Sequence, residues 1–141
     1  MIKIQKRDFN IEEEINLIKS KYSNIGALNS FVGFVRDFNE GQDVKFIELE
    51  VYEKMALAEL SKIQKKALDK WKLIDCLVIH RYGKLMVSDK IVLVACFSEH
   101  RNHSFKACKF IMDYLKKDAP FWKKETYSLG SKWLENTTQI E

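Results

Sequence analysis

Hydrophobic residues change their spacing along the chain, and the spacing predicts which segments form strands and which form helices. The stretch "KFIELEVYE" (residues 45–53) alternates between apolar and acidic side chains, which places Ile47, Leu49 and Val51 on one face of an extended chain. The stretch "KIVLVACFS" (residues 90–98) is apolar without interruption and predicts a strand that is covered on both faces.

Apolar residues at helical spacing predict three helices. Ile11, Ile15 and Ile18 share one face of the first helix, and Asn10 followed by Glu13 is the signature of a capping box at its start. The predicted helices cover about residues 11–20, 55–71 and 104–117, and the remaining predicted strands cover residues 2–5, 26–36 and 73–83.

These elements alternate without a repeat, a low-complexity tract or a linker rich in Pro or Gly. A chain of 141 residues, 46% of them hydrophobic, can bury one substantial core but is too short for two full domains. We therefore expect a single α/β (α+β) domain over residues 1–141 with mixed strand directions. Residues 37–43 are expected to form a turn or a mobile loop, and Gly33 a bulge or a close backbone approach.

The sequence also excludes several classes of protein. No stretch approaches the ~18 consecutive apolar residues of a membrane span, and the N-terminus lacks the apolar region of a secretory signal, so we expect a cytoplasmic protein. Neither of two common phosphate-binding loops, G-x-x-x-x-G-K-[ST] and G-x-G-x-x-G, is present.

Cys76, Cys96 and Cys108 are widely spaced in apolar surroundings, so we expect buried reduced thiols, with a persulfide-carrying cysteine as the alternative. His100 and His103 have no third ligand nearby, and no metal site is expected.

The last predicted helix runs into the only proline of the chain, in "DYLKKDAPFWKKE" (residues 113–125). On a helical wheel Lys116 lies only about 40° from Met112, at the border of the apolar sector. A lysine in this position can extend outward to water, or it can point into a pocket and take part in acid–base chemistry. The helical pattern leaves both alternatives open.

The proline ends this helix, and the residues after it can continue as a strand. In a strand, Phe121, Lys123 and Glu125 share one face, while Trp122 and Lys124 take the other. One lysine from the helix and one from the strand can then converge beside an aromatic wall that excludes water.

Three further basic residues are candidate contacts for an anion. His100 and Arg101 follow a buried strand and precede a helix, where free backbone N–H groups and the helix dipole attract anions. Arg36 ends another strand just before a loop, and an arginine binds phosphate or carboxylate through two hydrogen bonds. The alternative for the first two is that a nearby Ser or Asn caps the helix and leaves them exposed. His80 and Arg81 end another strand, and we interpret them as mainly structural.

Several longer segments stand in a specific order between residues 26 and 135: "GALNSFVGFVRDFNEG", "LEVYEKMA", "IHRYGKL", "VACFSEHRNHSFKACKFIMDYLKKDAPFWKKE" and "KWLE". In this order and spacing they resemble the large, catalytic subunit of molybdopterin synthase, the MoaE family. The block from "SEHR" to "PFWKKE" is the most specific part of the resemblance. The N-terminal residues and the tail "ENTTQIE" match weakly.

The resemblance implies an α/β hammerhead-type domain with a small additional antiparallel β subdomain, here inserted at about residues 36–52. It implies a homodimer at the core of a heterotetramer, in which each copy binds one small ubiquitin-like sulfur-carrier subunit. The C-terminal Gly-Gly tail of that partner, carried as a thiocarboxylate, is expected to enter a pocket of this chain. Sulfur then passes to cyclic pyranopterin monophosphate, and two rounds form the dithiolene of molybdopterin. We expect no metal, cofactor, nucleic acid or membrane to take part.

The same resemblance assigns roles to individual residues. Lys116 and Lys123 match the catalytic lysines, the first assisting proton transfer beside the thiocarboxylate and the second holding anionic groups and polarising the reacting centre. The expected substrate-binding residues are Phe34, Val35, Arg36, His100, Arg101, Met112, Lys124 and Glu125. Among them, the His-Arg pair is expected to reach the site from the other protomer, and the methionine to form a pocket wall.

A second interpretation of the basic segment from Arg101 to Lys124 is a non-enzymatic module that binds RNA or an acidic protein. Lys and Arg outnumber Asp there, and aromatic side chains can stack on bases, namely Phe105, Tyr114, Phe121 and Trp122. Against it, most of these aromatics fall on the predicted core side, and no RNP-type or KH-type motif is present. A third alternative is a family member that assembles but has lost catalysis; the intact lysines argue against it.

Overall fold

The computed structural model describes residues 1–39, 41–127 and 130–134, and of Gln42 and residues 130–134 it describes the backbone alone. The tail "ENTTQIE" lies outside the described residues. In chain order the elements are β1 (Ile2–Gln5), α1 (Ile11–Lys19), β2 (Ala27–Phe34), β3 (Phe38–Asn39), β4 (Gln42–Val51), α2 (Glu53–Trp71), β5 (Asp75–Arg81), β6 (Gly83–Met86), β7 (Lys90–Ser98), α3 (Arg101–Lys117), β8 (Phe121–Tyr127) and β9 (Gly130–Leu134).

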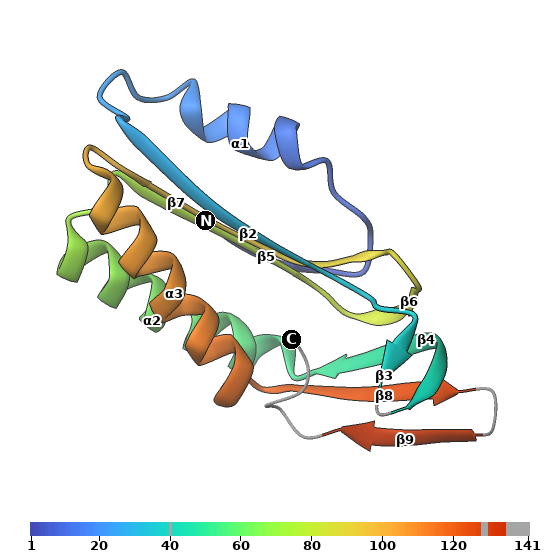
Figure 1. The fold of residues 1–141 in the computed structure, drawn as a ribbon. Helices are drawn as coiled ribbons and strands as arrows, with labels where there is room; N and C mark the ends of the chain where they lie inside the picture. The colour runs from blue at the N-terminus through green and yellow to red at the C-terminus, as the bar shows by residue number, and fades with distance from the viewer. Residues whose placement is uncertain (40, 128–129, 135–141) are drawn as a thin grey trace.

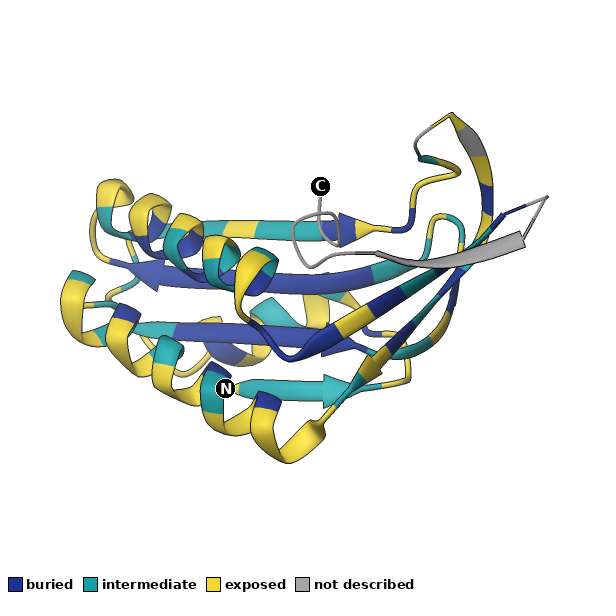
Figure 2. Cartoon of the chain, turned by 90° about the horizontal axis from the view of Figure 1, so that it is seen from below, coloured by how far each residue is buried: buried dark blue, intermediate teal, exposed yellow. Residues whose placement is uncertain are grey.

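One sheet has the strand order β1-β5-β7-β2, with β1 parallel to β5 and the other neighbours antiparallel. Helix α1 lies on one face of this sheet, and α2 and α3 lie side by side on the other (Figure 1). Because side chains alternate along a strand, Leu77 and Ile79 of β5 pack with residues of α1, while Cys76 and Val78 pack with residues of α2 and α3. Strand β7 is buried from Ile91 to its end (Figure 2). The prediction of a strand covered on both faces is confirmed.

A second sheet has the order β3-β4-β8-β9, and β6 also pairs with β4. Strands β3, β6 and β9 were not predicted, because β3 has only two residues and the residues of β6 and β9 do not alternate clearly between apolar and polar. Strand β3 lies inside the segment that we expected to be a loop, and residues 36–52 supply β3 and β4 to this sheet. The mixed α/β fold class is confirmed.

The three predicted helices are confirmed with small shifts at their starts. Asn10 caps α1, accepting a hydrogen bond from the backbone N–H of Glu13 at 3.0 Å. Helix α2 begins two residues before the expected start, and α3 begins three residues before it. Within the described residues, no helix is both long enough and apolar enough to cross a bilayer.

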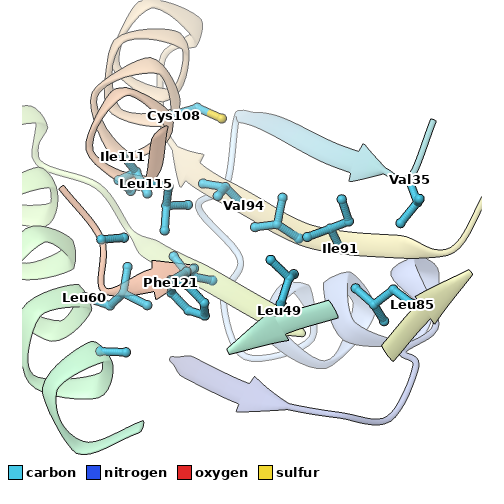
Figure 3. Close-up of a cluster of buried hydrophobic side chains, with 14 of the residues drawn as sticks. Val35, Leu49, Leu60, Leu85, Ile91, Val94, Cys108, Ile111, Leu115 and Phe121 are labelled. Atoms are coloured by element: carbon cyan, nitrogen blue, oxygen red, sulfur yellow. The ribbon is translucent and has the colours of Figure 1, made fainter. Parts of the chain in front are cut away.

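The main core lies where α2 and α3 meet both sheets, and Phe121 is its link to β8 (Figure 3). This first residue of β8 is fully buried, and its ring stacks on the ring of His80 with the centroids 3.8 Å apart. Burying a phenylalanine stabilises the fold by ~1.5–3 kcal/mol. The start of β8 is therefore anchored at the centre of the molecule, directly after the proline that ends α3.

The three cysteines are buried and unpaired, as predicted. Cys76 and Cys96 lie opposite each other on β5 and β7 with their Sγ atoms 3.9 Å apart, and Cys108 packs in the same core. Hydrogen bonding with Cys108 and Cys76, together with burial, raises the pKa of the Cys96 thiol. A thiol that stays protonated is a poor nucleophile.

His80 is a structural residue, as the sequence indicated. Burial lowers the pKa of His80 to about 4, which the hydrogen bond between its Nδ1 and the carbonyl of Arg81 at 2.8 Å only partly opposes. The ring is therefore neutral in the folded protein near neutral pH and serves as an apolar surface for Phe121.

We predict that His80 makes folding stability depend on pH in the acid range. The unfolded residue takes up a proton near its ordinary pKa of 6.5, but the folded residue does so only near 4, so stability falls as the pH drops between these values. Between pH 7.5 and about pH 5 the loss from this residue is about 2 kcal/mol. Urea denaturation of the wild type and of His80→Gln at both pH values measures it, and the variant is expected to lack this part of the drop. The control His103→Gln, on α3, is expected to keep the drop; the same drop in His80→Gln would contradict the assignment.

Candidate active site

The end of β2 is shaped by a β-bulge between Gly33 and Phe34, where the register against β7 shifts. Beyond the bulge, Val35 is held by two backbone hydrogen bonds, of 2.8 Å from Ser88 and 2.9 Å to Asp89. The predicted irregularity at the glycine is therefore a bulge. It leaves Phe34 half exposed and Val35 buried at the edge of the main core.

A narrow cleft lies between the end of β2, the β3–β4 hairpin and β8. Phe38 lines the cleft together with five of the residues that we expected at the site. These five are Phe34, Val35, Arg36, Lys123 and Glu125. Its enclosed volume of about 10 Å³ leaves room for about one water molecule. A pterin is far larger, so a substrate of that size has to lie across the mouth of the cleft in this conformation.

Lys123 and Glu125 form a buried ion pair in this cleft. The Nζ and Oε2 atoms are 3.6 Å apart, and only 8% and 5% of the two side chains are exposed. The other carboxylate oxygen of Glu125, Oε1, accepts a hydrogen bond from Asn39 Nδ2 at 2.8 Å and another from the hydroxyl of Tyr127. The predicted alternation along β8 is confirmed, since residues 121, 123 and 125 are all buried. The ammonium group of Lys123 therefore sits at a fixed place in a largely dry cleft.

The two aromatic residues after the proline do not form the wall that we expected. Phe121 belongs to the core, and Trp122 lies on the opposite face of β8 from Lys123, 41% exposed, with its ring edge-on to Tyr52 at 5.0 Å. These two rings line a separate hollow. Alternation along a strand makes this unavoidable, because neighbouring residues point to opposite faces.

Lys124 follows the same rule and is not brought to the cleft. As the alternation along the strand predicted, it lies on the face of Trp122, opposite Glu48 of β4. Its role as a substrate contact stays a prediction. Phe105, one of the aromatic residues named above for base stacking, is 60% exposed, so it does not lie on the core side of α3.

Lys116 is half-buried in the last turn of α3, in keeping with its position at the border of the apolar sector. It is not among the described residues that line the cleft, whereas Met112, one turn earlier, packs against the main core. Residues 118–120 connect α3 directly to β8, and the buried Ala119 accepts a hydrogen bond from the Phe121 N–H at 2.8 Å. Lys116 therefore lies at the C-terminal end of α3, and the chain runs from this end into β8 (Figure 1).

His100 and Arg101 are exposed at the opposite end of α3. The backbone of His100 is extended at the N-cap position and its side chain makes no capping hydrogen bond, so it leaves the first N–H groups of the helix available to an anion. Fifteen residues separate Arg101 from Lys116, a distance of about 22 Å along the helix axis. Within one chain the structure does not bring these two groups together.

Gly26 allows β2 to begin against the loop that leads into α3. A Cβ atom at this position would lie 2.1 Å from the carbonyl oxygen of Glu99, so only glycine fits without a backbone shift. The N–H of Gly26 also donates to the carbonyl of Ser98 at 3.0 Å. This close approach, which no pattern in the sequence indicates, fixes the backbone immediately before His100.

Three residues of the site were missed: Phe38, Asn39 and Tyr127. Tyr127 could have been found by extending the alternation of β8 by two residues. The other two lie in a segment without a period, so no signal in the sequence placed them. In the part of the chain that the structure describes, no group of three or more His, Cys, Asp or Glu side chains is arranged to hold a metal ion.

Comparison with known proteins identifies relatives over nearly the whole chain. The molybdopterin synthase catalytic subunit of Ralstonia nicotianae is 49% identical over 134 residues, which is 95% of this chain and 76% of the relative. The MoaE protein of molybdopterin biosynthesis from Burkholderia ambifaria has a solved structure that matches with a TM-score of 0.84 at 41% identity, covering 100% of this chain and 92% of that one. The structure of molybdopterin synthase from Staphylococcus aureus matches with a TM-score of 0.87 at 31% identity, covering 94% and 95%.

The family model described as MoaE protein matches residues 4–118, well over half of the chain. That match ends before Lys123, but the relative from Ralstonia is aligned over almost the whole length. The chain belongs to the MoaE family.

Proposed function

We propose that this chain is the catalytic subunit of a molybdopterin synthase. It transfers sulfur from the C-terminal thiocarboxylate of a small ubiquitin-like subunit to cyclic pyranopterin monophosphate, and two transfers form the dithiolene of molybdopterin. The observation that carries the proposal is the buried ion pair of Lys123 and Glu125, which lies in a cleft with Arg36. The relatives of this chain are named molybdopterin synthase catalytic subunit, which supports it.

Lys123 stabilises negative charge during the transfer. In each round the thiocarboxylate sulfur bonds to a substrate carbon, which gives up an oxygen substituent. Water then attacks the acyl carbon of the partner's tail, so that the bond between this carbon and the sulfur breaks, the sulfur stays on the substrate and the tail leaves as a carboxylate. Attack at that acyl carbon places negative charge on its oxygen, and a fixed ammonium group stabilises such charge most strongly where little water screens it. Glu125 makes it possible to bury the cation, because an unpaired buried charge would be strongly destabilising.

Lys116 serves proton transfer beside the thiocarboxylate and the substrate. Its place in the last turn of α3 puts its positive charge at the negative end of the helix dipole, which is favourable. A half-buried lysine beside an acyl group and a bound sulfur can donate and accept protons as the bonds change. No cysteine of this chain is required, because the sulfur arrives on the partner.

His100 and Arg101 bind the phosphate of the substrate from the second protomer of a homodimer. The cleft of one chain is too small to enclose a pterin, and the N-terminus of its own α3 lies about 22 Å from Lys116. A substrate lying across the cleft mouth can meet both sets of residues only if the second set comes from another copy. Two chains with one small subunit each then make a heterotetramer with two composite sites.

We predict that Lys123→Ala and Lys116→Ala each lower the rate of molybdopterin formation by about 100-fold or more, because each removes a charge that acts in the transition state. The assay uses the thiocarboxylated small subunit and cyclic pyranopterin monophosphate under single-turnover conditions. Lys109→Ala is the matched control, since this exposed lysine of α3 pairs with Asp113 at 2.7 Å on the surface; it should leave the rate unchanged. A near wild-type rate in either active-site variant would remove that lysine from the mechanism.

We also predict that two inactive variants restore activity when they share a dimer. Lys123→Ala and Arg101→Ala damage different halves of the composite site, so a mixed dimer has one site with both lesions and one intact site. Random exchange of equal amounts is expected to yield about a quarter of the wild-type activity. If the mixture stays as inactive as its components after exchange has been verified by native mass spectrometry, both residues act within one chain.

A further inference from the structure

Beyond the lysines, one group of side chains in the cleft has contacts that point to a specific task. Glu125 divides its two carboxylate oxygens between different partners: Oε2 faces Lys123 Nζ at 3.6 Å, while Oε1 accepts hydrogen bonds from Asn39 Nδ2 and from the Tyr127 hydroxyl. We infer that Tyr127 and Asn39 are positioning residues, which orient Glu125 so that it holds the Lys123 ammonium at the reacting centre. This inference rests on the proposed function.

Burial makes the orientation of the carboxylate matter. Glu125, Tyr127 and Lys123 are all buried, with between 4% and 6% of each residue exposed, so water is largely unavailable to replace a lost hydrogen bond. Two donors on Oε1 restrict rotation of the carboxylate group, since turning it would leave both donors unsatisfied in a dry environment. The remaining oxygen is thereby directed at the ammonium group.

The two donors come from different parts of the second sheet. Tyr127 stands two residues after Glu125 on the same face of β8, so its hydroxyl reaches the carboxylate along the strand. Asn39 comes from β3, which pairs only with β4 in the described part of the chain, and its neighbour Phe38 lines the same cleft. The amide of Asn39 therefore fastens the β3–β4 hairpin to the carboxylate that holds the catalytic cation.

This arrangement serves catalysis more than it serves stability. A lysine held only by its flexible four-carbon stem would sample many positions, and electrostatic stabilisation of a transition state depends on a charge that is already in place. Loss of either donor is expected to lower kcat, because the ammonium is then less well placed when charge develops. The apparent KM should change little, since neither donor is among the described residues that line the cleft.

The test compares Tyr127→Phe and Asn39→Ala with the wild type under single-turnover and steady-state conditions. Each variant is expected to lower kcat about tenfold with KM nearly unchanged. Tyr114→Phe is the matched control, because the buried Tyr114 hydroxyl has no hydrogen-bond partner among the residues that the structure describes; it should leave kcat unaltered. A wild-type kcat in both cleft variants would overturn the inference.

A double-mutant cycle separates positioning from a general loss of structure. If Tyr127 acts through Lys123, Tyr127→Phe should not slow the reaction further in the Lys123→Ala background. An equal tenfold loss in both backgrounds would mean that the hydroxyl acts elsewhere or only supports the fold, and the inference would fail.

A readout that needs no activity completes the test. Acetylation by acetic anhydride is followed by mass spectrometry, and in the wild type Lys123 should react slowly relative to the exposed Lys109. Tyr127→Phe and Asn39→Ala should each raise the ratio of acetylation at Lys123 to acetylation at Lys109. An unchanged ratio in both variants would contradict the positioning role. A wild type that labels as expected but makes no molybdopterin from the thiocarboxylated subunit would refute the proposed function instead, leaving the contacts of Glu125 without a catalytic task.

Discussion

The ion pair between Lys123 and Glu125 is the constraint on which the proposed active site depends. Two opposite charges that are almost out of contact with water are tolerated only when their geometry is good and their remaining hydrogen-bonding atoms are satisfied. Here those atoms are satisfied from two strands of the second sheet, through Asn39 of β3 and Tyr127 of β8. The two-residue strand β3 thereby becomes part of the proposed site.

The stability of that pair in turn depends on how β8 is anchored. Phe121, its first residue, stacks on a neutral buried His80 in the main core, and Pro120 separates it from α3. From this fixed point, strict alternation carries residues 123 and 125 to the cleft and residues 122 and 124 to the other face. The lysine pair in the sequence is therefore divided by the strand: Lys123 enters the cleft, and Lys124 does not.

Helix α3 separates two sets of basic residues by its own length. The rigid rise of an α-helix keeps Arg101 about 22 Å from Lys116, and Gly26 holds the backbone before His100 in place by an approach that no side chain would permit. A rigid spacer of this kind cannot be closed by a local movement. If both ends of α3 serve one substrate, symmetry between two chains is the simplest way to bring them together.

Sequence alone determined the fold class, the three helices, the strands with a clear period, and the segments to which we assign the chemistry. It did so because burial imposes periods of 3.6 and 2 residues on apolar positions, and because the motif around Lys116 and Lys123 is long and specific. Only the tertiary structure decided which side chains meet. Asn39 lies 86 positions from Glu125 along the chain, and a contact over such a separation leaves no local pattern to detect. The same holds for the aromatic residues that line the cleft, which are Phe34 and Phe38 and not the two residues after the proline. A strand directs neighbouring side chains to opposite faces, and only the packing around the strand decides which of its faces meets the cleft.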